Sequence, residues 1–163
     1  MKGHEYWLVR IVLVMSFTAC ENEAQSNDSE PSSVERKETE EVEDMTAMKM
    51  SVTIGEQFFT ATLENNTATH ELVKMMEKAP ISIEMNDYSG FEKVGPLGKS
   101  LPTDNRQMTT QSGDIVLYSG NRIVMFYGSN SWNYTKIGRI DDLSGWEDAL
   151  GAGSVTAVFS TAK

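Results

Sequence analysis

The chain contains 163 residues, of which 23% are charged, and its formal net charge is -10. No segment is basic enough to hold a phosphate backbone, so the composition argues against nucleic-acid binding. The single cysteine, Cys20, excludes an intrachain disulfide, and two histidines, His4 and His70, leave little material for a metal site. We therefore expect neither a metal nor a cofactor.

The first nineteen residues have the features of a secretory signal peptide. Lys2 and Arg10 supply positive charge, and residues 11–15 form an uninterrupted apolar run. The stretch at residues 7–19 is too short to cross ~30 Å of hydrocarbon as a permanent helix. We therefore predict that residues 1–19 are a signal peptide that is removed from the mature protein.

The end of this segment indicates a lipid anchor. Thr18 and Ala19 stand directly before Cys20, and this ending resembles a bacterial lipobox, although Phe17 replaces the usual leucine. The resemblance implies that Cys20 is diacylated and becomes the new N-terminus, which would hold the protein on a membrane of the bacterial cell envelope. Two or three acyl chains, at ~0.8 kcal/mol per buried methylene, anchor a small domain stably. The alternative is an ordinary cleaved signal followed by a chance cysteine.

Residues 20–47 are predicted to be the lipidated cysteine and a disordered acidic tether. Among residues 21–47, only Val34, Val42 and Met45 are sizeable apolar side chains, and they follow no helical or strand spacing. Such a stretch cannot bury enough apolar surface to offset the entropy of ordering. The folded part of the chain is therefore expected at residues 48–163, which are enough for one core.

Alternating and periodic apolar residues predict the first elements of this domain. Residues 49–54 and 57–63 alternate around a tight turn and predict a hairpin. An apolar stripe predicts a helix over about residues 68–78, with caps among the preceding Asn and Thr residues and Pro80 at its end. Residues 81–85 alternate again, and a short further strand is expected just after them.

The second half of the domain is richer in strand signals. Residues 96–112 contain two prolines and almost no aliphatic side chains, which predicts a long loop. Residues 114–127 contain two β-branched, aromatic-rich strands around a turn at residues 119–121. Residues 134–140 predict another strand.

The last elements decide the architecture. Ser144 and Glu147 form a capping-box pattern that opens a short helix ending at Leu150, and residues 154–161 predict the closing strand. Two helices cannot cover both faces of an eight-stranded sheet, so the sheet must cover itself by closing, with the helices at its ends. The predicted fold is mainly β with two helices, a closed eight-stranded barrel.

This element order is that of the cyclophilin barrel, and several segments support the likeness. Residues 113–140 resemble the signature stretch of the bacterial cyclophilin-like domain family. Residues 141–150 parallel the way in which cyclophilins enter their second helix, and residues 101–115 are similar to the proline-containing loop before a Gly-Asp strand start. The resemblance covers roughly residues 48–163 and implies a cyclophilin-like β-barrel.

Cyclophilins themselves are prolyl isomerases, which lower an amide rotation barrier of ~18–20 kcal/mol without a nucleophile or metal. They need an apolar pocket for the proline ring and an arginine that donates to the twisted amide nitrogen. Here the Phe-His-Arg run that carries this arginine is missing. Arg106 and Gln111 would be catalytic only if the protein is an isomerase; an exposed loop charge is the other interpretation of Arg106.

The aromatic residues around residues 128–131 allow two interpretations. In the first, Phe126 fills the barrel while Tyr127 and Tyr134 cover its outside. In the second, Trp132 and one tyrosine line an open groove, because tyrosine and tryptophan favour recognition surfaces. The resemblance places the segment at residues 92–97 beside the same groove, which makes Tyr88, Phe91, Glu92 and Lys93 second-line candidates. The candidate ligand-binding residues are Tyr88, Glu92, Lys93, Phe126, Tyr127, Asn130, Ser131, Trp132 and Tyr134.

We therefore expect a lipid-anchored envelope protein whose cyclophilin-like domain acts as a monomer. Its groove would bind a peptide segment or a small molecule without conventional catalysis. The alternative function is a peptidyl-prolyl cis-trans isomerase that acts on envelope proteins.

Overall fold

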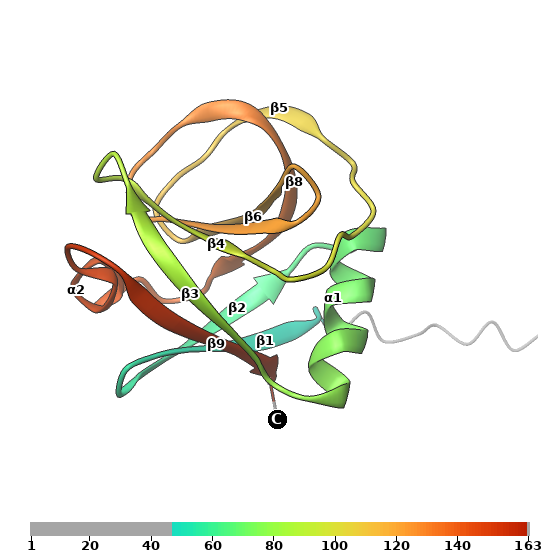
Figure 1. The fold of residues 1–163 in the computed structure, drawn as a ribbon, viewed down its shortest axis with the longest axis horizontal. Coiled ribbons are helices and arrows are strands. Elements are labelled where there is room, and N and C mark those ends of the chain that lie inside the picture. Colours follow the sequence, from blue (N-terminus) through green and yellow to red (C-terminus); the bar gives the residue numbers. More distant parts are fainter. Residues whose placement is uncertain (1–46, 163) are drawn as a thin grey trace, which may run out of the picture. The chain divides into compact units, whose positions relative to one another are not determined.

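The computed structural model describes residues 47–162, and the expected signal peptide, lipidated cysteine and all but the last residue of the tether lie outside them. Within this range the chain forms nine strands and two helices (Figure 1). In chain order they are β1 (Lys49–Ile54), β2 (Gln57–Leu63), α1 (Thr67–Lys78), β3 (Ile81–Tyr88), β4 (Glu92–Pro96), β5 (Arg106–Thr109), β6 (Asp114–Tyr118), β7 (Arg122–Phe126), β8 (Ser131–Ile140), α2 (Trp146–Leu150) and β9 (Val155–Thr161).

Eight of these strands close into an antiparallel barrel, as the sequence predicts. The order around the barrel is β2-β1-β9-β3-β4-β7-β6-β8, and β8 pairs back onto β2. The ninth strand, β5, pairs only with β8 and lies outside the closed ring. The expectation of an unbroken loop over residues 96–112 is therefore wrong, because β8 supplies a pairing partner for residues 106–109 that local sequence does not reveal.

The closure between β2 and β8 depends on a glycine. Gly138 pairs with Leu63, and a Cβ atom at Gly138 would lie 2.5 Å from the backbone oxygen of Thr62. Real Cβ atoms do not approach a carbonyl oxygen so closely, so a larger residue would force the two strands apart. Two backbone hydrogen bonds extend the contact between β2 and β8 at both ends. The Glu64 amide donates to the Ile137 oxygen at 2.8 Å, and the Asp141 amide donates to the Thr60 oxygen at 2.9 Å.

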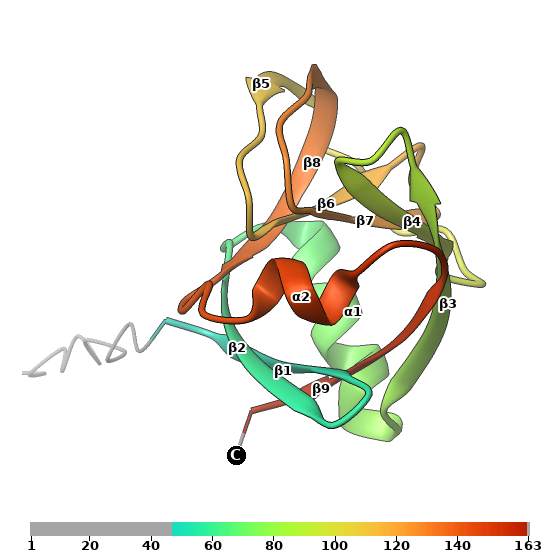
Figure 2. The ribbon, with the colours of Figure 1, turned by 90° about the vertical axis from the view of Figure 1, so that its left-hand side faces the viewer.

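The two helices lie at opposite ends of the barrel (Figures 1 and 2). Asn66 caps α1 by accepting a hydrogen bond from the Thr69 amide at 3.0 Å, and α1 buries Leu72 and Met76 in the barrel core. The capping box predicted for α2 is wrong. Its N-cap is Gly145 in the left-handed conformation, with no side-chain cap, and the Ser144 amide donates instead to Asp142.

Trp146 of α2 is the largest side chain in the barrel core. It is 1% exposed, and its ring packs edge-on against Phe59 with centroids 5.0 Å apart. Its indole Nε1 donates to the backbone oxygen of Phe126 at 2.9 Å, so its one polar group is satisfied inside the core. α2 therefore connects β2 and β7 across one end of the barrel.

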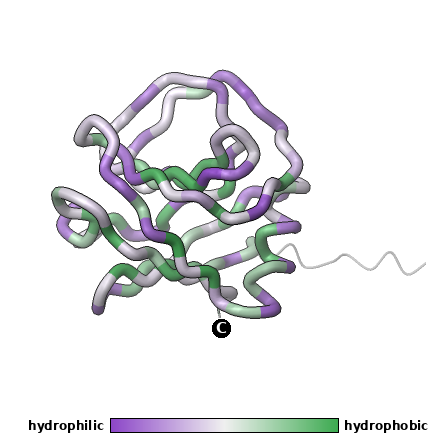
Figure 3. Tube along the Cα trace, viewed as in Figure 1, coloured by the Kyte–Doolittle hydropathy of each residue, from purple (hydrophilic) through white to green (hydrophobic). Residues whose placement is uncertain are grey.

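The β6–β7 hairpin consists mostly of apolar residues (Figure 3), and these residues are buried on both of its faces. Ile115, Leu117 and Met125 point into the barrel core. The alternate residues, which point outward, form a second, smaller cluster with Tyr134 of β8, and they are Val116, Val124 and Phe126. A strand buried on both faces requires a further layer of structure over its outer side. Part of that layer comes from β5 and the first half of β8.

The contrast between two tryptophans gives a test of this core. We predict that Trp146→Ala lowers the free energy of unfolding by ~3–5 kcal/mol, because it removes a buried ring and leaves a cavity. Trp132→Ala serves as the matched control, since Trp132 is 56% exposed, and it should change stability by less than ~1 kcal/mol. Chemical denaturation of both variants measures the difference. Equal losses of stability would contradict the placement of Trp146 in the core.

Candidate functional site

A bulge in β8 opens a groove on the outside of the barrel. Ile115 pairs with Gly138 but Val116 pairs with Lys136, so Ile137 is an extra residue on β8. A bulge bends its strand and re-aims the residues that follow. The first four residues of β8, 131–134, leave the barrel with β5 and stand over the outer faces of β6 and β7 (Figure 2).

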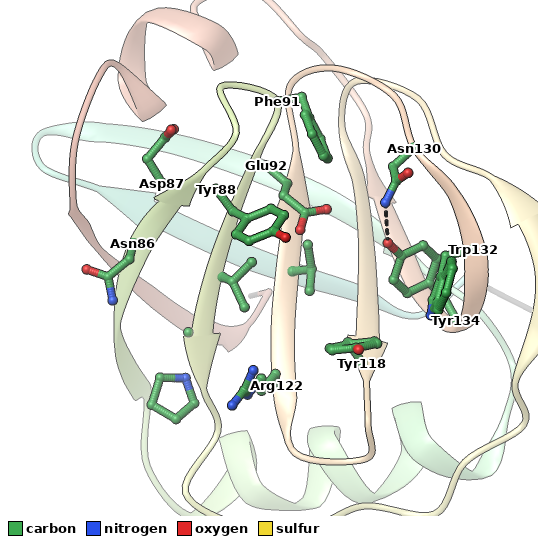
Figure 4. A pocket seen from close by; sticks show the side chains of 14 residues that line it. Asn86, Asp87, Tyr88, Phe91, Glu92, Tyr118, Arg122, Asn130, Trp132 and Tyr134 are labelled. Carbon is green, nitrogen blue, oxygen red and sulfur yellow. Dashed lines mark hydrogen bonds between the residues drawn. The ribbon is translucent and has the colours of Figure 1, made fainter.

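The outer groove lies between this wall and the β3–β4 hairpin (Figure 4). Its volume is about 840 Å³. Outward-facing side chains of β4, β6 and β7 form its floor. The residues that line the outer groove are Asn86, Asp87, Tyr88, Phe91, Glu92, Val94, Gly95, Pro96, Tyr118, Arg122, Val124, Asn130, Trp132 and Tyr134.

Five aromatic side chains dominate the lining. The Tyr88 and Phe91 rings meet edge-on with centroids 6.2 Å apart, on the hairpin side. On the other side, Tyr134 contacts Tyr118 edge-on, with centroids 6.1 Å apart, and Trp132 is largely exposed at the rim. Of the two sequence interpretations, the placement of Trp132 and Tyr134 matches the open groove.

Glu92 is the charged group at the floor of the outer groove. It is 6% exposed, and within the described residues its Oε2 atom has no hydrogen-bond partner. Burial raises its pKa to about 7 from 4.5, because the carboxylate loses water without gaining a donor. Figure 4 shows its carboxyl group pointing into the space between Tyr88 and Tyr134. A half-ionised carboxyl therefore faces an aromatic cavity at neutral pH.

Two arginines have different places in this region. Arg122 of β7 lines the outer groove. Arg106 does not; it is the first residue of β5 rather than part of a loop, and its guanidinium donates to Asp104 at 2.8 Å. Arg106 instead lines a separate, smaller pocket. The apolar groove thus has an arginine, but it is one that the sequence analysis did not single out.

Gln111 also lies outside the outer groove. Its backbone amide donates to Asp114 at 2.9 Å, and its side-chain oxygen accepts from Arg139 at 3.2 Å. These bonds hold the turn that leads into β6.

Lys93, adjacent to Glu92, points to the opposite face of the sheet. Its Nζ atom is fully buried and donates to Asp87 at 2.7 Å, to the Gly151 oxygen at 2.8 Å and to the Gly153 oxygen at 2.7 Å. The hydrogen bond from Lys93 is the main cause that lowers the pKa of Asp87. All three ammonium donors are occupied, so Lys93 fastens the β3–β4 hairpin to the turn after α2 and leaves no donor for a ligand.

The other candidate residues either pack behind the outer groove or lie at its edge. Phe126 does not fill the barrel; it is fully buried in the outer cluster, beneath Tyr134. Tyr127 packs against the barrel core instead of covering its outside, and its hydroxyl bonds to Asp87. Burial and this bond raise the pKa of Tyr127 to about 12.

The two polar candidates, Asn130 and Ser131, differ in position. Asn130 lines the groove and donates to the Tyr134 hydroxyl at 2.9 Å, whereas the Ser131 hydroxyl pairs with Thr109 at 2.7 Å.

Six of the fourteen lining residues were candidates from the sequence and eight were not, although strand alternation could have found three of those eight. Once β7 is recognised as a strand, Arg122 and Val124 must share the outward face, and Tyr118 of β6 lies opposite Arg122. The remaining five depend on the path of the β3–β4 hairpin, and they are Asn86, Asp87, Val94, Gly95 and Pro96.

Neither helix in residues 47–162 is long and apolar enough to cross a membrane. The same part of the chain has no cluster of three or more His, Cys, Asp or Glu side chains that could hold a metal ion.

Comparison with known proteins agrees with a cyclophilin-like barrel. No curated protein matches this sequence. The family model described as the Cyclophilin-like family matches residues 52–160, which include nine of the eleven elements in full, half of β1 and all but the last residue of β9. Since this match covers well over half of the chain, the protein belongs to the Cyclophilin-like family.

Proposed function

We propose that this protein is a lipid-anchored binding protein of the cell envelope whose outer groove holds a peptide segment or a small molecule. The observation that carries the proposal is the outer groove itself, with its aromatic lining and its buried carboxyl. Its volume of about 840 Å³ falls within the ~300–1,000 Å³ common for ligand sites. The backbone pairings of β4, β6, β7 and β8 hold the strands that form this groove.

Trp132 supports a role in recognition. It is 56% exposed at the rim of the outer groove, where it pairs across the strands with Met108 of β5. A large ring held on a strand offers contact area at a small entropic cost, which is why tryptophan is frequent at binding hot spots. Asn130 and Tyr134 add directional polar groups beside it.

We predict that removing this ring weakens binding without unfolding the protein. The probes are a set of short peptides and small aromatic amides, and amide shifts in NMR spectra locate and quantify their binding. Trp132→Ala should weaken the binding of groove ligands at least about tenfold, which corresponds to ~1.4 kcal/mol.

Phe58→Ala is the matched control, because Phe58 is 76% exposed but lies on β2, outside the outer groove. It should leave the affinities unchanged. Probes that shift only amides remote from the outer groove, or that bind Trp132→Ala as well as the wild type, would contradict the proposal.

One observation favours the alternative of a prolyl isomerase. Arg122 lines an aromatic groove, and an arginine beside an apolar pocket is the pair of features that amide-bond rotation needs. Arg122 is exposed at the groove and lies beside Tyr118 and Pro96 rather than among hydrophobic groups that would exclude water. We therefore hold ligand binding to be the primary function.

An exchange assay on short X-Pro peptides separates the two functions. We predict that the protein leaves the cis-trans exchange rate at its uncatalysed value. Acceleration that Arg122→Ala abolishes and Arg106→Ala preserves would establish isomerase activity in the outer groove instead. Arg106 is the suitable control because its charge pairs with Asp104 and lies outside that groove.

The envelope location rests on the sequence before residue 20. We predict that the wild-type protein partitions with membranes, whereas Cys20→Ser becomes soluble or keeps its signal peptide. Detergent-phase partitioning with immunoblotting measures this difference. Equal partitioning of the two proteins would contradict lipid anchoring and leave the groove proposal intact.

A further inference from the structure

Among the residues that the structure describes, Glu92 has no cationic partner. Within residues 47–162 its carboxylate takes part in no ion pair, and its Oε2 atom accepts no hydrogen bond. Its neighbour in sequence, Lys93, is turned to the barrel interior and is occupied by Asp87 and two carbonyl oxygens. A buried carboxylate without a partner is unfavourable, so such groups are normally paired.

The charged and titratable groups around Glu92 do not supply that partner. Arg122 lies four residues along β7 from Phe126, the residue opposite Glu92, which corresponds to about 13 Å along the strand. Asp87 is engaged by Lys93 and Tyr127. The remaining groups that face this region are phenols from β3, β6 and β8, and they are Tyr88, Tyr118 and Tyr134.

The surroundings of Glu92 suit a cation better than any other ligand group. Tyr88 lies opposite Glu92 on β3, Phe91 precedes it, and Tyr134 faces it across the outer groove (Figure 4). Aromatic faces attract cations, and a carboxylate among them adds a full opposite charge. A neutral ligand would leave that carboxylate buried and unpaired, and an anionic ligand would be repelled.

We propose that the outer groove selects ligands that carry a basic nitrogen, a protonated amine or guanidinium, which pairs with Glu92 among the rings of Tyr88, Phe91 and Tyr134. This inference rests on the proposed binding function of the outer groove and names the class of ligand. Binding of the cation requires the ionised form of Glu92, so the ligand affinity rises with pH up to about 7 and levels off above it.

Two matched probes test the inference. N-acetyl-lysine methylamide and N-acetyl-norleucine methylamide share a backbone and an alkyl chain and differ in the ammonium group. At pH 8 the lysine probe should bind at least about tenfold more tightly than the norleucine probe, as measured by shifts of groove amides. At pH 6 this preference should shrink, although the ammonium stays protonated at both pH values.

Glu92→Gln removes the charge with little change of shape and should abolish the preference for lysine. Glu84→Gln is the matched control, because Glu84 is exposed on β3 and does not line the outer groove, and it should keep the preference. The amide spectrum of each variant shows whether it is folded.

Three outcomes would overturn the inference. The first is equal binding of the two probes to the wild type, and the second is a lysine preference that survives in Glu92→Gln. The third is the absence of groove shifts with the lysine probe. If neutral members of the larger probe set still bind the outer groove, only the cation selectivity fails. If none of them binds there, the proposed function fails as well.

Discussion

The architecture depends on β8, whose ten residues belong to two structures at once. Residues 135–140 pair with β6 or β2 and close the barrel, and residues 131–134 pair with β5 and form a wall of the outer groove. The bulge at Ile137 lies within the pairing with β6, and Gly138 allows the close approach to β2. The same strand therefore closes the core and forms the groove wall.

Burial of the Glu92 carboxylate lowers the stability of the folded protein at high pH, which favours a functional reason for its presence. In the folded protein its pKa is raised to about 7, whereas the ordinary value is 4.5, so the folded state binds the proton more tightly than the unfolded chain does. The stabilising effect of that proton is fully present below pH 4.5 and is lost as the pH rises through 7. The loss is on the order of 1–3 kcal/mol at alkaline pH. A glutamine would avoid it, so a carboxyl here is easier to explain by ligand binding than by folding.

Much of the fold was predictable because most strands bury one face. Alternation in residues 49–54 and 57–63 gave the bounds of β1 and β2, and the surplus of strands over helices required closure. β5 escaped prediction because its four residues bury no side chain fully, and its partner lies more than twenty residues away. The start of α2 differs from the predicted capping box because Gly145, in the left-handed conformation, is the N-cap and offers no side chain.

The site was predictable in part. Tyr88, Glu92, Asn130, Trp132 and Tyr134 meet in one groove, although they come from segments about forty residues apart. Lys93 shows the limit of sequence reasoning here. A lysine next to Glu92 suggests a second ligand contact. A strand turns neighbouring side chains to opposite faces, however, and two of the groups that bind the Lys93 ammonium come from the turn between α2 and β9.

The burial of Glu92 without a cationic partner is tested most directly by measuring the pKa of its side chain in the unliganded protein. A carbon-detected NMR titration of the glutamate carboxyl groups, with the Glu92 signal assigned from its loss in Glu92→Gln, gives that value. The structure predicts a midpoint of about 7, because the carboxyl is buried without a cationic partner. A midpoint at the ordinary value of 4.5 would show that the Glu92 carboxyl is hydrated or already paired, and would contradict the account.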